Sequence, residues 1–265
     1  MTKPILFCIP HAGGSAGVFM RWRKPLADLV TVVPLELPGR GSRIGEALVD
    51  DAVECGEDAA ASIREYLAQH ATDDQEYIIL GHSMGSLVAY ETYQALSRRH
   101  PGTAERPWMP RHMIFSGRTS PHRTTSTTQY HRIADDDEFI DAIDQYGGGT
   151  ASALRASEEL REMFLPVLRA DFKLSETYVW DDDRAPVSCS ATILNGSDDR
   201  SVSREGAAQW EELITGEVEH EFRPGGHFFL YEDDAAARDV TTAAVNRIAR
   251  KHDNLNLRQT RKATR

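Results

Sequence analysis

Six short runs of apolar and β-branched residues recur along the chain, and helix-compatible stretches separate most of them. The runs occupy residues 5–9, 30–35, 77–81, 112–117, 191–196 and 218–222. Strands that are apolar on both faces and alternate with helices are typical of a parallel sheet covered on both sides. The sequence therefore predicts an α/β fold with a mainly parallel sheet and helices on both faces.

Three of the separating stretches have the pattern of surface helices. Residues 50–70 begin with acidic residues and residues 84–99 end with arginines, as the helix dipole favours. Residues 234–252 carry apolar residues at every fourth position, which predicts a helix that packs along one face.

Residues 118–185 interrupt the alternation, because they contain no convincing strand and are too long for a plain connection. Two amphipathic stretches, 134–149 and 157–180, lie within them, and Pro166 is expected to kink the second. Small helices inserted between strands are typical of a lid over a pocket. We predict a helical lid insertion, with an extra layer of packing helices as the alternative.

Length and composition indicate one domain. We expect residues 1–250 to form it and residues 251–265, which are polar and basic without periodicity, to be a disordered tail. A formal net charge of −11 disfavours nucleic-acid binding. No apolar run is long enough to span a membrane, and three cysteines at no metal-like spacing suit a reducing cytoplasm. We expect a cytoplasmic monomer.

The fragment Gly-His-Ser-Met-Gly, residues 81–85, joins a predicted strand to a predicted helix. The pattern G-x-S-x-G in that context indicates a nucleophile elbow, a tight turn that raises the serine above the sheet edge. Side chains at 81 and 85 would collide with the neighbouring elements, which explains the two glycines. We predict that Ser83 is a nucleophile.

A serine hydroxyl needs a general base, and the base needs an orienting carboxylate. In this architecture the expected chain order is serine, acid, histidine. The turn after the fifth predicted strand carries Asp198 and Asp199, and His227 follows Pro-Gly-Gly after the sixth. We predict His227 as the base and Asp199 as the acid, with Asp198 as the alternative.

An acyl-transfer site also needs backbone N–H groups that stabilise the oxyanion. The small-residue turn after the first predicted strand, Pro-His-Ala-Gly-Gly, is suited to provide one. Ala12 is the first candidate and Gly13 the second, while Met84 provides the other donor beside the nucleophile. His11 could be a second base, but we expect it to shape the pocket wall, as His82 does beside the elbow.

Other chemistries have less support. The remaining histidines form no metal-binding spacing, and no phosphate- or dinucleotide-binding glycine pattern is present, so no metal or cofactor is expected. The acidic run 135–138 is explained by acids at a helix start rather than by a calcium site.

Together these motifs resemble the type II thioesterases, free-standing α/β-hydrolases associated with polyketide synthases and nonribosomal peptide synthetases. The fragments IPHAGGSAGVF, ELPGRGSR, GHSMGSLVAYE, DFKLSETY, NGSDDRSVS and RPGGHFFL carry the resemblance, which spans roughly residues 4–248. It implies Ser83, Asp199 and His227 as the catalytic triad. It also implies a substrate, namely acyl groups bound as thioesters to the phosphopantetheine arm of acyl or peptidyl carrier proteins. The family's role would be to remove aberrant or stalled acyl units.

Two alternatives remain open: a general carboxylesterase or acyltransferase with the same triad, and a silent hydrolase fold that acts as a binding module. Carrier proteins are usually acidic, as this chain is, so long-range attraction is not expected. We therefore hypothesise a local basic patch near the mouth of the lid, with residues 117–123 as its candidate source.

Overall fold

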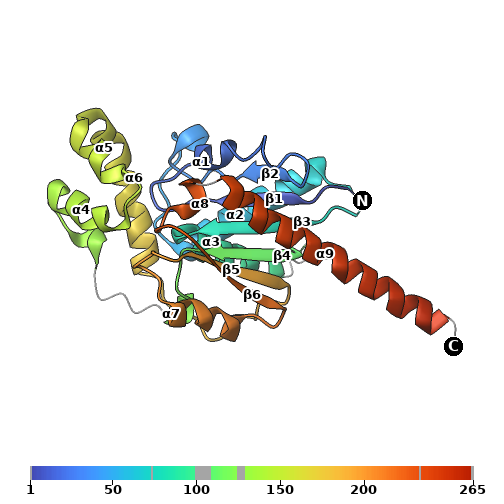
Figure 1. Cartoon of the computed structure of the whole chain (residues 1–265). Helices are drawn as coiled ribbons and strands as arrows, with labels where there is room; N and C mark the ends of the chain where they lie inside the picture. The colour runs from blue at the N-terminus through green and yellow to red at the C-terminus, as the bar shows by residue number, and fades with distance from the viewer. Residues whose placement is uncertain (1, 73, 99–108, 124–128, 233, 264–265) are drawn as a thin grey trace.

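The computed structural model describes residues 2–72, 74–98, 109–123, 129–232 and 234–263. In this part of the chain six strands form one sheet, in the order β2-β1-β3-β4-β5-β6, and every neighbouring pair is parallel (Figure 1). The strands are β1 (Ile5–Ile9), β2 (Thr31–Pro34), β3 (Tyr77–His82), β4 (His112–Ser116), β5 (Ser190–Gly196) and β6 (Val218–Arg223). Each end lies within one residue of the predicted run, so the predicted parallel α/β architecture is confirmed.

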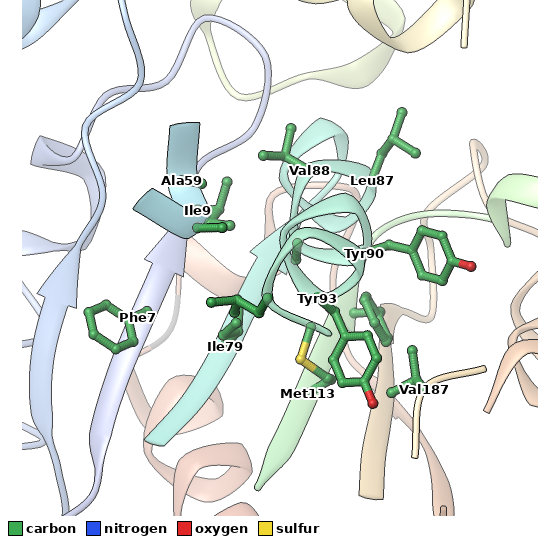
Figure 2. Packing of buried hydrophobic residues seen from close by; sticks show 14 of the residues in the cluster. Phe7, Ile9, Ala59, Ile79, Leu87, Val88, Tyr90, Tyr93, Met113 and Val187 are labelled. Carbon is green, nitrogen blue, oxygen red and sulfur yellow. The ribbon is translucent and has the colours of Figure 1, made fainter. Parts of the chain in front are cut away.

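One face of the sheet packs against α2 (Ala52–His70) and α3 (Met84–Ser97). Successive side chains of a strand point to opposite faces, so alternate residues of each strand belong to this core. Figure 2 shows Phe7 and Ile79 of the sheet and Val88 of α3, which belong to the same cluster of buried side chains. This is the larger of the two cores that flank the sheet.

The other face packs against α1 (Gly17–Met20), α8 (Phe229–Glu232) and α9 (Asp234–Ala263). The intervening strand residues, such as Leu6 and Leu80, fill this second core. The apolar positions predicted for the last helix are buried there, and they are Val240, Ala244 and Ile248. Helices thus cover both faces, as predicted.

Short polar side chains explain where several helices begin. Asp51 accepts hydrogen bonds from the first-turn amides of α2, and Asp135 accepts one from Glu138 N–H at the start of α4. Such caps satisfy amides that have no partner within the helix. The predicted role of the acidic run 135–138, a helix start, is therefore confirmed.

Residues 118–185 are the helical insertion, whose helices α4 and α5 project from the sheet domain and share a small core with α6 (Figure 1). Phe139 and Leu154 are fully or almost fully buried there, and Pro166 lies inside the longest described helix of the insertion. The insertion contains η2 (Pro121–Arg123), η3 (Tyr130–Arg132), α4 (Asp136–Ile143), η4 (Asp144–Tyr146), α5 (Thr150–Ala156) and α6 (Glu158–Glu176). The remaining elements are η1 (Gly41–Arg43), α7 (Arg204–Ala208) and η5 (Gln209–Leu213).

The C-terminal segment differs from its prediction. Helix α9 continues through residues 251–263, where the sequence predicts a disordered tail. No glycine or proline interrupts residues 234–263, and arginine, lysine, glutamine and leucine are good helix formers. Because propagation of a helix costs far less than nucleation, a helix that starts on the sheet can continue beyond it (Figure 1). No helix in the described ranges is long and apolar enough to cross a membrane.

Candidate active site

Ser83 lies at a strained turn between β3 and α3. Its φ is 56°, and it is the one non-glycine residue with positive φ in the described chain. A Cβ at Gly81 would lie 2.0 Å from the carbonyl oxygen of Gly85, and a Cβ at Gly85 would lie 2.3 Å from that of Ile9. Both obstacles are backbone atoms, so the turn can form only with glycine at the two positions. The first turn of α3 directs its free amides to the space beside Ser83.

Three side chains from different loops form a hydrogen-bonded series at the carboxyl edge of the sheet. His227 Nε2 lies 2.9 Å from Ser83 Oγ, and His227 Nδ1 lies 2.7 Å from Asp199 Oδ2. The loops follow β3, β5 and β6, whose carboxyl ends meet at one edge because all the strands are parallel. The structure thus brings together the three residues that the sequence predicts as nucleophile, acid and base.

The adjacent aspartates have different surroundings. Asp199 is 9% exposed and contacts the imidazole, whereas the side chain of Asp198 is exposed and its backbone N–H donates to Gly225. Burial raises the pKa of Asp199. Its hydrogen bond to His227, the charge of that histidine and the hydrogen bonds from Ser201 lower the pKa by more, so it lies below its usual value. The carboxylate is therefore ionised at neutral pH.

Ser201 was not found by sequence reasoning. Its Oγ donates to Asp199 Oδ1 at 2.6 Å and lies 3.1 Å from His227 Nδ1, and its N–H also donates to Asp199 at 2.8 Å. The hydroxyl thus holds the carboxylate against the imidazole. The only sequence signal was a serine two residues after the acid, a spacing common in turns.

The two candidates for the oxyanion donor after β1 also differ. Gly13 N–H donates to Asp171 Oδ2 at 2.7 Å and is not free for a substrate. Ala12 lines the same cavity as Ser83, and no hydrogen bond from its N–H to any described residue is present. Met84 begins α3, so its amide has no partner within the helix.

Of the two nearby histidines, His82 is fully buried and His11 is partly buried. Burial lowers the pKa of His11 to about 3, and the charges of His227 and Arg40 add to this effect. Burial also lowers the pKa of His82 well below its usual value, and its Nδ1 contacts Ser116 Oγ at 3.0 Å. His11 packs against Phe228, with ring centroids 4.9 Å apart. His11 also lines the cavity beside Ser83, and these contacts fit packing roles for both histidines better than a second base.

A cavity of about 420 Å³ adjoins Ser83 and is bounded by both the sheet loops and the helical insertion. Apolar side chains of the insertion, including Ile143, Leu168 and Phe172, form part of its wall. This volume suits a small to medium acyl group. Among the described residues, no three histidine, cysteine or acidic side chains are grouped to hold a metal ion.

Residues 117–123 do not form the hypothesised basic patch. Arg118 lines the cavity, and burial lowers its pKa to about 10. Arg123 pairs with Glu212 at 3.0 Å, and His122 lies 3.1 Å from the same carboxylate. The charges of this segment are thus turned inward or neutralised, which the sequence could not indicate because Glu212 lies far along the chain.

Comparison with known proteins places this arrangement in a family. The family model described as "Thioesterase domain" matches residues 4–247. The chain belongs to this family. It is 36% identical over 240 residues to the probable cadicidin biosynthesis thioesterase of Streptomyces griseus, covering 90% of this chain and 62% of that relative's length. It is 30% identical to the gramicidin S biosynthesis protein GrsT of Aneurinibacillus migulanus, over 87% of this chain and 84% of GrsT.

Solved thioesterase structures have the same fold. RedJ, a thioesterase from the prodiginine pathway of Streptomyces coelicolor, is 32% identical with a TM-score of 0.76, covering 91% of this chain and 89% of RedJ. ClbQ from the colibactin pathway is 27% identical with a TM-score of 0.78, covering 96% of this chain and all of ClbQ (100%). The predicted α/β-hydrolase fold and the resemblance to type II thioesterases are both confirmed.

Proposed function

We propose that this thioesterase-family protein is a serine hydrolase that cleaves acyl thioesters from the phosphopantetheine arm of carrier proteins. Its role would be to remove aberrant or stalled acyl units during polyketide or nonribosomal peptide biosynthesis. The observation that carries the proposal is the continuous contact from Asp199 through His227 to Ser83 at the edge of an acyl-sized cavity. Relatives named for antibiotic pathways support the substrate class.

The geometry supports a two-step mechanism. His227 Nε2 accepts the Ser83 proton as Oγ attacks the thioester carbonyl, and Asp199 stabilises the imidazolium that forms. The amides of Ala12 and Met84 donate to the oxyanion. The pantetheine sulfur leaves with the proton from His227 and the acyl-serine remains. Water then attacks the ester with His227 again as base, which releases the carboxylic acid and restores Ser83.

The helical insertion is proposed to act as the lid of this cavity. Its apolar wall would hold the acyl chain, and it limits the access of water to the reacting carbonyl. The identity of the acyl group would then depend on the side chains that the insertion contributes, rather than on the triad.

The decisive experiment is hydrolysis of a panel of acyl-loaded carrier proteins by the wild type and by Ser83→Ala. The wild type should release free acid from short to medium acyl chains, and Ser83→Ala should lose more than about 10⁴-fold in kcat. Soluble p-nitrophenyl esters serve as the comparison. A preference for these esters by orders of magnitude would favour a general carboxylesterase, and an acyl product on an added alcohol or amine in place of free acid would favour a transferase.

Covalent labelling separates an enzyme from a binding module. A fluorophosphonate should modify Ser83 in the wild type with a stoichiometry near one, because an activated serine is required. Folded protein that binds an acyl carrier but gives no adduct at Ser83 would support the binding module.

A further inference from the structure

Helix α6 of the insertion contacts the turn after β1 at Gly13. Asp171 accepts a hydrogen bond from Gly13 N–H at 2.7 Å. One helical turn earlier, Leu168 packs so closely that a Cβ at Gly13 would lie 2.6 Å from its side chain. Gly13 also has a φ of 75°, which disfavours any other residue. Residues i and i+3 lie on the same side of a helix, so one side of α6 holds this turn.

A buried ion pair fixes Asp171 in turn. Arg40 donates to both carboxylate oxygens, at 2.6 and 2.7 Å, and its side chain is 6% exposed while that of Asp171 is fully buried. Burial lowers the pKa of Arg40, but the hydrogen bonds and charge of Asp171 raise it more, so the guanidinium stays charged. Arg40 also donates to the carbonyl oxygen of Gly14 at 3.3 Å. Planar two-bond contacts of this kind allow little movement.

These contacts determine the direction of the Ala12 N–H. The carbonyl of His11, which belongs to the same peptide unit as that N–H, accepts a hydrogen bond from Gly14 N–H at 2.9 Å. In a trans peptide the N–H points opposite to the carbonyl. The following peptide unit is held through Gly13 N–H by Asp171, and the carbonyl of Gly14 is held by Arg40. The peptide unit that carries the proposed oxyanion donor is therefore held within the turn, and the unit after it is held by Asp171 of α6.

We propose that Asp171 and Arg40 are positioning residues that tie helix α6 to the oxyanion turn, so that the Ala12 N–H is correctly aimed only when α6 is docked on the sheet domain. The inference rests on the proposed function, since it needs Ala12 as a donor to the transition state. It implies that the helical insertion does more than bound the cavity. A displaced α6 removes the acceptor from Gly13 N–H and frees the turn to rotate.

The test compares Asp171→Asn with Lys173→Ala. Lys173 lies on the same helix and pairs with Asp50 at 2.6 Å, but both side chains are about half exposed, and no hydrogen bond joins either side chain to the described residues of the turn. Asp171→Asn keeps the shape of the side chain and loses one oxygen, so it cannot serve Gly13 and both Arg40 nitrogens. Arg40→Lys is the second variant, because it retains the charge without the two-point contact. If one variant does not fold, the other still decides the question.

Three assays are run on each variant. Fluorophosphonate end-point labelling gives the concentration of active sites, acyl-carrier hydrolysis gives kcat and KM per active site, and inhibition by an alkyl boronic acid reports the oxyanion site. The boronate forms a tetrahedral adduct on Ser83 with one oxygen where the oxyanion would lie. Complete loss of one oxyanion donor costs about 10²–10³ in kcat. We expect Asp171→Asn to lose between about 10-fold and that limit, with KM within about twofold and the boronate Ki raised in parallel. Lys173→Ala should match the wild type within about twofold.

A purely structural role has a different outcome. It would lower the fraction of active sites or the Tm while kcat per active site and the boronate Ki stayed at wild-type values, and that result would overturn the proposal. Equal losses in Asp171→Asn and Lys173→Ala would also overturn it. A wild type that neither hydrolyses carrier thioesters nor takes the label at Ser83 would instead refute the proposed function, so the two failures can be told apart.

Discussion

Replacement of Asp199 should nearly abolish catalysis, while replacement of the adjacent Asp198 should change little. In Asp199→Asn the amide is nearly isosteric with the carboxylate, but it can donate to His227 Nδ1 and so favour the tautomer that has its proton on Nε2. That nitrogen lies 2.9 Å from Ser83 Oγ and must be unprotonated to accept the serine proton. Asp198→Asn is the matched control, because it changes the same charge at an exposed side chain.

The magnitude follows from the contacts that are lost. Loss of the orienting carboxylate in a Ser-His-Asp triad costs about 10⁴ in kcat, or about 5.4 kcal/mol at about 1.36 kcal/mol per tenfold change. Ser201 Oγ lies 3.1 Å from His227 Nδ1 and can accept a hydrogen bond from Nδ1–H, which retains part of the correct tautomer. We therefore expect a loss of about 10³–10⁴ in kcat for Asp199→Asn and less than about twofold for Asp198→Asn.

The assay is the release of thiol from an acyl-pantetheine thioester, with active sites counted by fluorophosphonate labelling. The small substrate removes any contribution from carrier docking. A variant Asp199→Asn that retains a tenth or more of the wild-type kcat would refute the reasoning. So would a loss in Asp198→Asn equal to that in Asp199→Asn, since the two carboxylates would then be equivalent.

Three further predictions concern the same edge of the sheet. Ser201→Ala should lower kcat by about tenfold, because a hydrogen bond to a charged group contributes about 1.5–3 kcal/mol and part of the orientation of Asp199 would remain. Steady-state kinetics per active site tests this prediction. An unchanged rate would show that Ser201 does not help to orient Asp199. Gly85→Ala should prevent the elbow from forming, because its Cβ would lie 2.3 and 2.5 Å from two carbonyl oxygens at the end of β1. The control Gly45→Ala, whose Cβ would have nothing within 4 Å, should melt as the wild type does. Thermal melting and Ser83 labelling distinguish the two variants, and a labelled, stable Gly85→Ala protein would contradict the steric argument. The wild type should be more stable than Asp199→Asn above about pH 4, the pKa of an unfolded aspartate, and this advantage should disappear as the pH falls through the lower folded pKa of Asp199. The reason is that protonation of Asp199 removes its ion pair with His227. Measuring Tm against pH checks the sign, and an advantage that grew on acidification would contradict it.

The fold could be predicted from the sequence because its signals are local. Strand runs that are apolar on both faces, such as 77–81, are distinct in composition from the amphipathic helices between them. The elbow is also local, because the clash that requires Gly81 and Gly85 involves elements that are adjacent in the chain or in the sheet. Where local signals were weak the prediction differed from the structure. Residues 251–263 have helix formers but no apolar periodicity, and they continue α9.

Contacts between distant segments could not be predicted. Arg40 and Asp171 are separated by 131 positions, and each has ordinary neighbours in the sequence. The neutralisation of Arg123 by Glu212 depends on a comparable approach of two separate loops. Ser201 contacts both Asp199 and His227 because of the path that its turn takes, and that path decides which residue of the turn faces the imidazole.

The residue types and their order along the chain were enough to indicate a parallel α/β-hydrolase with a serine nucleophile, because strand, turn and helix propensities act over a few residues. Which aspartate meets His227, which amide of the β1 turn remains free, and how α6 holds that turn were decided by folding alone. The physical reason is that these properties depend on distances of about 3 Å between side chains remote in sequence, and hydrogen-bond strength falls steeply beyond that range.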